Sequence, residues 1–184
     1  MKTKSLFKNL LPGICLSTIS LFNLLNAQEV IMTDIEIINV KATKALYLKA
    51  DVPIQSIGGK MGEMYGKLYG YLGQNKIEPA GYPMAVYYSF DPNGNTLFEA
   101  LVPISDTITP ADEIGYKEYP AMKVVSAKYT GSYDNMAIVY SKIQKYIKEN
   151  KLETTGVSWE VYLTDPEEID DPEKNETVIY FPIK

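Results

Sequence analysis

Met61–Tyr87 reads MGEMYGKLYGYLGQNKIEPAGYPMAVY and Met136–Tyr162 reads MAIVYSKIQKYIKENKLETTGVSWEVY, and these two stretches decide the fold. Aligned without gaps at an offset of 75 residues, they are identical at ten of 27 positions. The identical pairs are Met61/Met136, Tyr65/Tyr140, Lys67/Lys142, Tyr71/Tyr146, Asn75/Asn150, Lys76/Lys151, Glu78/Glu153, Gly81/Gly156, Val86/Val161 and Tyr87/Tyr162. This self-similarity predicts an internal duplication, and its long period excludes a solenoid of short repeats. We therefore expect one domain built from two halves around a pseudo-twofold axis.

Each half has the pattern of a strand, a helix and two further strands. In the second half, Gly131 ends an extended segment, and Ser132 or Asp134 caps a helix. Apolar side chains line one face of that helix, and mostly lysines line the other. A turn at Gly156 then leads to a strand rich in valine, tyrosine and tryptophan, and a polar loop precedes the last strand. The extended segments that we expect are Ile35–Val40, Ala45–Asp51, Leu97–Val102, Met122–Tyr129 and Thr177–Phe181.

These elements predict an α+β fold of tandem βαββ-type units. The natural way to bury the helices is to pack both on one face of a single antiparallel sheet. The other face of the sheet then needs a cover, a partner or a ligand. We expect the first copy over about residues 33–104, a connection over 105–113, and the second copy over 114–184.

The first 27 residues have the three-part pattern of a secretory signal peptide. Lys2, Lys4 and Lys8 form a positive leader, Leu10–Leu25 is largely apolar, and Ala27 offers a cleavage point. The apolar stretch is shorter than the roughly 20 residues that a membrane helix needs. We therefore expect a mature chain over residues 28–184 that is exported to the periplasm or secreted; an uncleaved membrane anchor is the alternative.

The residue types present exclude several kinds of chemistry. The chain has no histidine and no arginine, and its one cysteine, Cys15, lies in the predicted leader. The mature chain therefore offers no usual zinc or haem ligand set and no Ser-His-Asp or Cys-His arrangement. Removing the three leader lysines changes the net charge from −5 to −8, which disfavours nucleic acid and anionic ligands. We expect no metal, no cofactor and no nucleic-acid partner.

Three motifs carry a family resemblance. Trp159–Pro166 (WEVYLTDP) is followed by an acidic loop and a closing Val178–Ile183 (VIYFPI), and Tyr129–Tyr133 (YTGSY) precedes a helix. Together they resemble the gyrase-inhibitor-like (GyrI-like) superfamily over about residues 33–184. The resemblance implies a ligand cleft at the pseudo-twofold axis that binds small, often cationic or aromatic molecules. The same fold serves as the effector-binding domain of multidrug-responsive transcription activators, and some relatives are hydrolases that open strained rings.

Glu160 breaks the symmetry between the two halves, because Ala85 occupies the aligned position. Strand alternation puts Ser158, Glu160 and Tyr162 on one face of their strand, and Trp159 with its apolar neighbours on the other. We expect the apolar set to face the helices, so that Glu160 points into the open face of the sheet. A solvated strand glutamate is the alternative. The resemblance favours the cleft, since the matching glutamate of the activators lies among pocket aromatics.

Tyrosine is the other residue type that points to a ligand. Faces of aromatic rings attract cations by about 0.5–2 kcal/mol each, and the chain has 15 tyrosines. The residues that we expect at the ligand site, by strand position, are Glu160, Tyr162, Tyr87, Tyr47, Tyr129 and Tyr180. The tyrosines that recur on both predicted helices are assigned to packing: Tyr65, Tyr71, Tyr140 and Tyr146.

Two further patterns have structural interpretations. Gly58, Gly62, Gly66 and Gly70 recur every four residues along the first predicted helix, and each interior glycine costs about 1 kcal/mol relative to alanine. We interpret them as a surface for close helix packing, with a frayed helix as the alternative. The acidic loop over 165–176 lacks the ligand spacing of an EF-hand, and we interpret it as a solvated turn.

Three functions remain open at this point. The first is an exported module that captures a hydrophobic or cationic compound in a tyrosine-rich cleft with Glu160 as counter-charge. The second is a cofactor-free hydrolase of strained or electrophilic small molecules that uses Glu160 as general base. The third is a structural protein whose open sheet face binds a partner chain.

Overall fold

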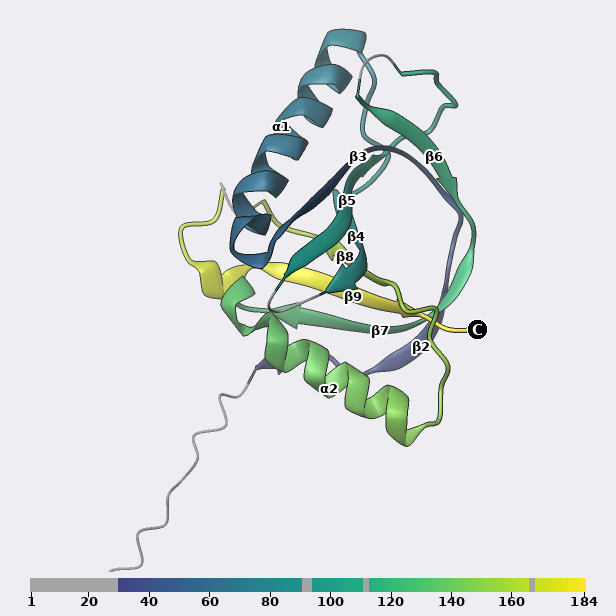
Figure 1. The fold of residues 1–184 in the computed structure, drawn as a ribbon, viewed down its shortest axis with the longest axis vertical. Helices are drawn as coiled ribbons and strands as arrows, with labels where there is room; N and C mark the ends of the chain where they lie inside the picture. Colours follow the sequence, from purple (N-terminus) through teal and green to yellow (C-terminus); the bar gives the residue numbers. More distant parts are fainter. Residues whose placement is uncertain (1–29, 91–93, 111–112, 166–167) are drawn as a thin grey trace, which may run out of the picture.

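One antiparallel sheet organises the chain (Figure 1). The computed structural model describes residues 30–184 except 91–93, 111–112 and 166–167, so the predicted leader over 1–27 lies outside the described residues. The described strands are β1 (Ile31–Met32), β2 (Glu36–Val40), β3 (Thr43–Pro53), β4 (Met84–Phe90), β5 (Asn95–Pro103), β6 (Gly115–Tyr119), β7 (Met122–Thr130), β8 (Ser158–Tyr162) and β9 (Glu176–Pro182). The described helices are α1 (Ile57–Asn75) and α2 (Met136–Glu149), with 3-10 turns η1 (Ile54–Ser56), η2 (Tyr133–Asn135) and η3 (Pro172–Lys174).

The order of strands brings the two halves of the chain together at the centre of the sheet. The order is β1-β7-β9-β8-β4-β5-β3-β6, and β2 also pairs with β7. The elements β3-η1-α1-β4-β5 recur in kind as β7-η2-α2-β8-β9, and β4 pairs with β8. The α+β class and the antiparallel sheet are thus confirmed. β6, which the sequence did not predict, extends the sheet beyond β3.

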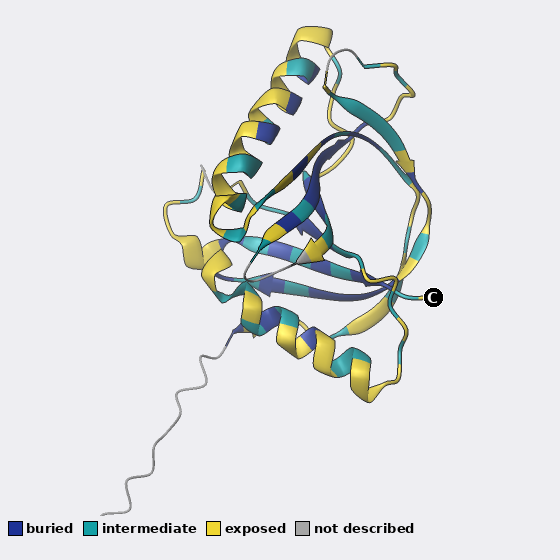
Figure 2. Ribbon diagram, viewed as in Figure 1, coloured by how far each residue is buried: buried dark blue, intermediate teal, exposed yellow. Residues whose placement is uncertain are grey.

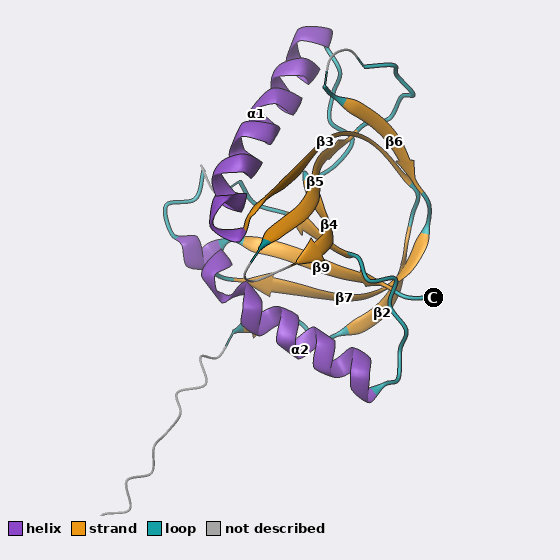
Figure 3. Cartoon of the chain, in the orientation of Figure 1, coloured by secondary structure: helices purple, strands orange, loops and turns teal. Residues whose placement is uncertain are grey.

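Both helices lie on the outer face of the curved sheet (Figures 1 and 3). The buried side chains of Met64, Leu68 and Leu72 recur every four residues. They therefore lie on one face of α1, against β3 and β5. Val139 and Ile143 do the same for α2 against β7 and β9. The yellow outer faces of both helices in Figure 2 are exposed, as expected for amphipathic helices on a sheet. Within the described residues, no helix is both long and apolar enough to cross a membrane.

A separate apolar cluster fills the inner, concave face of the sheet. The ring of Tyr119 from β6 meets Trp159 of β8 edge-on, with 4.9 Å between centroids, although three strands separate β6 from β8 in the sheet. The members of this cluster are Ala45, Met84, Val86, Leu101, Tyr119, Trp159 and Val161. Strong curvature therefore lets the sheet pack against itself, and neither α1 nor α2 lies on this face.

The predicted sidedness of β8 is corrected by this cluster. Trp159 and Val161, which we expected under the helices, lie on the concave face. Glu160 instead faces the helices, since its carboxylate accepts a hydrogen bond from Tyr140 of α2. The physical reason is that a strongly curved sheet needs its own apolar filling on the inside. An apolar strand face therefore does not identify the helix-covered side.

The glycines of α1 face solvent rather than another element. A Cβ atom built at Gly58, Gly62, Gly66 or Gly70 would meet no other atom within 4 Å, apart from the helix's own backbone. The prediction of close helix packing along these glycines is therefore wrong. They remove side chains from an exposed face and lower the helix propensity of α1 without any compensating contact within the described residues.

Replacing one of these glycines should stabilise the protein. We expect Gly66→Ala to raise the free energy of unfolding by about 1 kcal/mol, because alanine restricts the unfolded chain and meets no clash in α1. The reverse change at the exposed position of α2 that aligns with Gly62, Ala137→Gly, should cost about the same. Urea unfolding curves of the three proteins measure both changes, and a loss of stability in Gly66→Ala would contradict the open glycine face.

Candidate functional site

Glu160 lies where the two halves of the sheet meet. In the alignment of the two copies Glu160 corresponds to Ala85, and in the sheet these residues are direct cross-strand partners. Side chains of such partners lie on the same face with Cβ atoms about 5 Å apart. The methyl group of Ala85 therefore leaves room for one larger side chain. A glutamate in both copies would bring two carboxylates together at this point.

Three tyrosine hydroxyls surround the carboxylate of Glu160. Tyr140 donates to Oε1 at 2.7 Å, and Tyr162 donates to Oε2 at 2.7 Å. Tyr87 donates to Oε2 at 3.4 Å, and its hydroxyl lies 3.2 Å from that of Tyr162. Glu160 itself is only 7% exposed. Groups from β4, β8 and α2 thus enclose one buried carboxylate.

A row of aromatic rings connects this carboxylate to the surface. Tyr65 of α1 and Tyr133 of η2 each stand edge-on to Tyr162, at centroid distances of 6.3 and 6.0 Å. Tyr65 also contacts Tyr69 at 6.4 Å, and its hydroxyl donates to the carbonyl oxygen of Met84. Tyr69 and Tyr133 are exposed. Rings from α1, η2 and β8 therefore lie between Glu160 and the exposed Tyr69 and Tyr133.

The electrostatics of the cluster are those of a buried carboxylate held by neutral hydrogen-bond donors. Burial raises the pKa of Glu160 above its ordinary value, although the hydrogen bonds from Tyr140, Tyr162 and Tyr87 oppose the shift. Burial also raises the pKa of all three tyrosines, so their hydroxyls stay protonated and donate. Among the described residues no lysine forms a salt bridge with Glu160. The described residues also contain no group of acidic side chains arranged to hold a metal ion.

A second buried glutamate, Glu99 of β5, has a different set of partners. It accepts hydrogen bonds from the hydroxyls of Tyr88 and Tyr119, as Glu160 does from its tyrosines. It also forms a salt bridge with Lys117, whose Nζ lies 3.4 Å from Oε2. Tyr119 belongs to the cluster on the concave face, so Glu99 and Glu160 lie on opposite faces of the sheet. Within the part of the chain that the structure describes, a lysine thus accompanies one tyrosine-bound carboxylate and not the other.

The other predicted site residues do not all lie near Glu160. Tyr87 and Tyr162 contact it, whereas Tyr47 and Tyr180 pack with the cluster on the concave face. Tyr129 is buried under α2. The prediction that all five tyrosines share one site is therefore corrected. The prediction assigned the wrong face of the sheet to the helices, so a tyrosine's position in its strand did not show on which face it lies.

The turn after β7 explains why Tyr129 is a structural residue. Its hydroxyl donates to the carbonyl oxygen of Ser132, and its ring occupies the space of a side chain at Gly131, whose φ is 149°. Ser132 in turn accepts a hydrogen bond from the backbone N–H of Asp134 and caps η2 ahead of α2. The YTGSY motif thus positions α2, and Tyr140 with it.

Sequence reasoning missed Tyr65 and Tyr140, which it had assigned to packing. Tyr140 makes one of the two shortest hydrogen bonds to Glu160, and Tyr65 packs against Tyr162. The alignment of the two copies keeps tyrosine at both positions, but it also keeps Tyr71 and Tyr146, which pack against the apolar clusters, so recurrence alone could not separate the two pairs.

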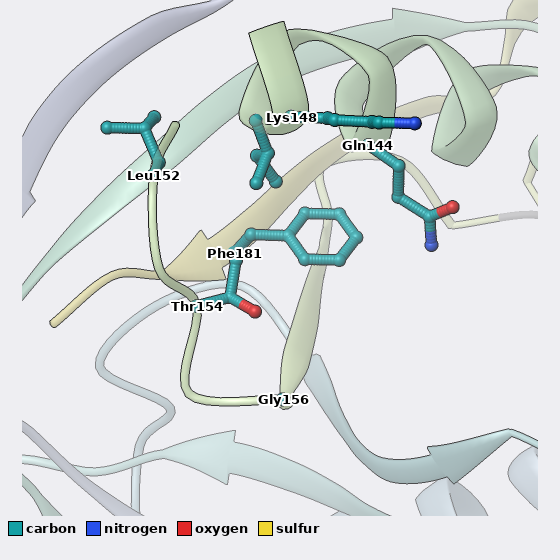
Figure 4. Close-up of a pocket in the computed structure, with 7 residues that line it drawn as sticks. Gln144, Lys148, Leu152, Thr154, Gly156 and Phe181 are labelled. Carbon is teal, nitrogen blue, oxygen red and sulfur yellow. The ribbon is translucent and has the colours of Figure 1, made fainter. Parts of the chain in front are cut away.

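Two surface hollows of about 420 Å³ each are found, and neither includes Glu160. The first lies between the C-terminal half of α2 and the loop before β8, with Gln144, Lys148 and Phe181 in its wall (Figure 4). The ring of Phe181 packs on Tyr140 at 5.5 Å, so this hollow lies behind the tyrosine that binds Glu160. The second lies on the concave side, between β2, β7 and β9. The tyrosine hydroxyls themselves close over the carboxylate.

The raised pKa of Glu160 predicts a stability that depends on pH. Below the ordinary carboxyl pKa, about 4, Glu160 is neutral in both the folded and the unfolded chain. As the pH rises through the raised folded-state pKa, the unfolded chain binds fewer protons and the folded state loses stability. We therefore expect Glu160→Gln to melt at a higher temperature than the wild type at pH 7, and the difference to close near pH 4. Melting curves of both proteins between these pH values measure it.

A matched control for this experiment is Glu153→Gln, since the Glu153 side chain is 78% exposed. Its melting temperature should follow the wild type at every pH. A constant difference between Glu160→Gln and the wild type across the pH range would contradict a perturbed carboxyl.

A protein family and several solved structures resemble this chain. Residues 33–184 match the model of the GyrI-like small molecule binding domain family. The C-terminal domain of EcmrR is similar in structure, with a TM-score of 0.67 and 20% identity over 82% of this chain and 97% of that domain. In an EcmrR–DNA complex the chain spans 57% of EcmrR, with a TM-score of 0.69 and 19% identity over 82% of this chain.

Two other solved structures have the same fold at low identity. SAV2435, solved bound to tetraphenylphosphonium, has a TM-score of 0.61 and 12% identity over 83% of this chain and 94% of that one. A hydrolase from Listeria innocua has a TM-score of 0.60 and 15% identity over 82% and 91%. Among curated proteins, none matches this chain.

Proposed function

Because this chain belongs to the family of GyrI-like small-molecule-binding domains, as its motifs predicted, we propose that it captures an organic cation between α1 and α2. Glu160 supplies the counter-charge, and the surrounding tyrosines supply the walls. We further propose that the two halves arose by duplication and that the signal-peptide pattern of residues 1–27 directs export, so that capture takes place in the periplasm or outside the cell.

The observation that carries the proposal is a buried carboxylate with tyrosine donors and no lysine partner among residues 30–184 as the structure describes them. Removing a charge from water costs several kcal/mol unless an opposite charge or hydrogen bonds compensate. At Glu99 the chain provides the opposite charge itself, through Lys117. At Glu160 the three hydroxyls compensate only in part, since the pKa remains raised. A ligand cation would complete the cluster as Lys117 completes the other one.

The aromatic rings favour a lipophilic cation over a small hydrated ion. A ligand that reached Glu160 from the side of the exposed Tyr69 and Tyr133 would meet the rings of Tyr65 and Tyr162, which contact them. Each ring that faces the cation contributes about 0.5–2 kcal/mol, most where water is excluded. The tetraphenylphosphonium bound by SAV2435 supports this ligand class, since that protein has the same fold.

The first test of this proposal compares a cation with a neutral molecule of similar shape. We expect methyltriphenylphosphonium to bind the mature chain and triphenylphosphine oxide to bind at least tenfold more weakly, because only the former carries a charge for Glu160. Isothermal titration calorimetry measures both affinities. Glu160→Gln should abolish the preference, whereas Glu99→Gln, the matched change on the other face of the sheet, should leave it intact.

The pH dependence of the same titration has a defined sign. Protonation of Glu160 removes the counter-charge, so cation affinity should fall as the pH is lowered through the raised pKa of Glu160. Equal affinities for the cation and the neutral molecule in the wild type would overturn the counter-charge role of Glu160.

One observation favours hydrolysis as a second candidate function. A glutamate with a raised pKa beside protonated tyrosine hydroxyls has the properties of a general base paired with a proton donor. Glu160 would take a proton from an attacking water, and a tyrosine would protonate the atom that leaves a strained ring. Styrene oxide tests this: diol formation that Glu160→Gln abolishes would support catalysis, and binding of the cation without any turnover would support capture alone.

A further inference from the structure

The buried glutamate on the concave face, Glu99, forms a cage of its own. Oε2 accepts hydrogen bonds from Tyr88 at 2.6 Å and from Tyr119 at 2.8 Å, and the Glu99 side chain is only 5% exposed. Tyr47 lies beside them, with its ring over Gly115 of the paired strand β6. Four strands therefore converge on one carboxylate: β3, β4, β5 and β6. This cluster has no part in the capture proposed at Glu160.

The cage already holds a cation, the ammonium group of Lys117. Its Nζ lies 4.7 Å from the ring centroid of Tyr119, 5.5 Å from that of Tyr88 and 5.9 Å from that of Tyr47. Three rings and a carboxylate around one nitrogen is the arrangement by which proteins recognise quaternary ammonium groups. The lysine thus marks where a ligand nitrogen would sit.

Lys117 occupies this position imperfectly. Its Nζ lies 3.4 Å from the Glu99 carboxylate, whereas charge-assisted hydrogen bonds of this kind are usually about 2.7–2.9 Å. Its nearest polar partner is the hydroxyl of Tyr88, at 3.0 Å. The Lys117 side chain is 41% exposed, so it reaches the cage from the solvent side and can return to water. The ammonium of Lys117 is therefore held loosely and is partly exposed to solvent. A free cation that fits the cage better can displace it.

We propose that the cage of Glu99, Tyr47, Tyr88 and Tyr119 is a second cation site of this protein, which binds a small quaternary ammonium in exchange for Lys117. The ligand is small because Trp159, 5% exposed, packs on Tyr119 and closes the back of the cage. Methyl groups on the nitrogen would contact the rings where the ammonium of Lys117 leaves space. The ammonium of Lys49, which lies 5.7 Å from the Tyr88 centroid, stays at the rim.

Choline and its neutral isostere 3,3-dimethyl-1-butanol test the proposal. Trp159 is the one tryptophan of the chain and contacts the cage through Tyr119, so its fluorescence reports binding on this face. At constant ionic strength we expect choline, and not the alcohol, to change the fluorescence. Lys117→Met should bind choline at least tenfold more tightly, because a tethered competitor has an effective concentration in the millimolar range. Glu99→Gln should lose binding, and Glu160→Gln should retain it.

A measurement on the wild-type chain decides the question even if Lys117→Met does not fold. Acylation of lysines, followed by mass spectrometry, should become faster at Lys117 when choline is added at about 100 mM, well above the millimolar effective concentration of a short tether. Lys145, whose side chain is 75% exposed, is the internal control and should react at an unchanged rate. Unchanged labelling of Lys117 would overturn the proposal. Because Glu160→Gln separates the two faces, failure here leaves the capture proposed at Glu160 standing, and the reverse also holds.

Discussion

The hydrogen bonds between one carboxylate and three tyrosine hydroxyls tie the two halves of this protein together. Glu160 comes from β8, and its donors come from β4, β8 and α2. No single half contains the whole set. The position of α2, which the turn at Gly131 sets, and the pairing of β4 with β8 are therefore both conditions for the cluster. A buried charge of this kind stabilises the folded state only when all its hydrogen-bond donors are in place.

Because the sheet is strongly curved, its two faces are packed in different ways. A flat sheet with two helices on one side would leave its other side open to solvent. Here the concave side packs against itself, as the contact of Tyr119 with Trp159 across three intervening strands makes clear. The same strands thus serve both faces of the sheet, and each face carries one tyrosine-bound glutamate. Three tyrosine hydroxyls bind Glu160, whereas two tyrosine hydroxyls and a lysine bind Glu99.

Much of the fold follows from the sequence because it depends on local patterns. Helix periodicity, the glycine turns and the self-alignment predicted the strand–helix–strand–strand order of both halves, and the motifs predicted the family, whereas β6 was not predicted. The sequence also singled out Glu160 and Tyr87 with Tyr162, since an unmatched acid between matched strands stands out. Sidedness could not be predicted, because the apolar face of β8 suits a helix and a self-packed concave interior equally well. That one ambiguity misplaced Tyr47 and Tyr180 and hid the polar role of Tyr140.

The register between β4 and β8 has a consequence for how this chain can change over evolutionary time. Successive residues of a strand point to opposite faces, so a single insertion or deletion within Ser158–Tyr162 would exchange the two faces of β8. Trp159 would then lie among the tyrosines under α2, and Glu160 would lie in the apolar interior. Point substitutions can adjust the chemistry of either face one residue at a time, whereas a change of length at this position destroys both faces at once. We therefore expect variation in length to be confined to the loops and the central strand pair to keep its length.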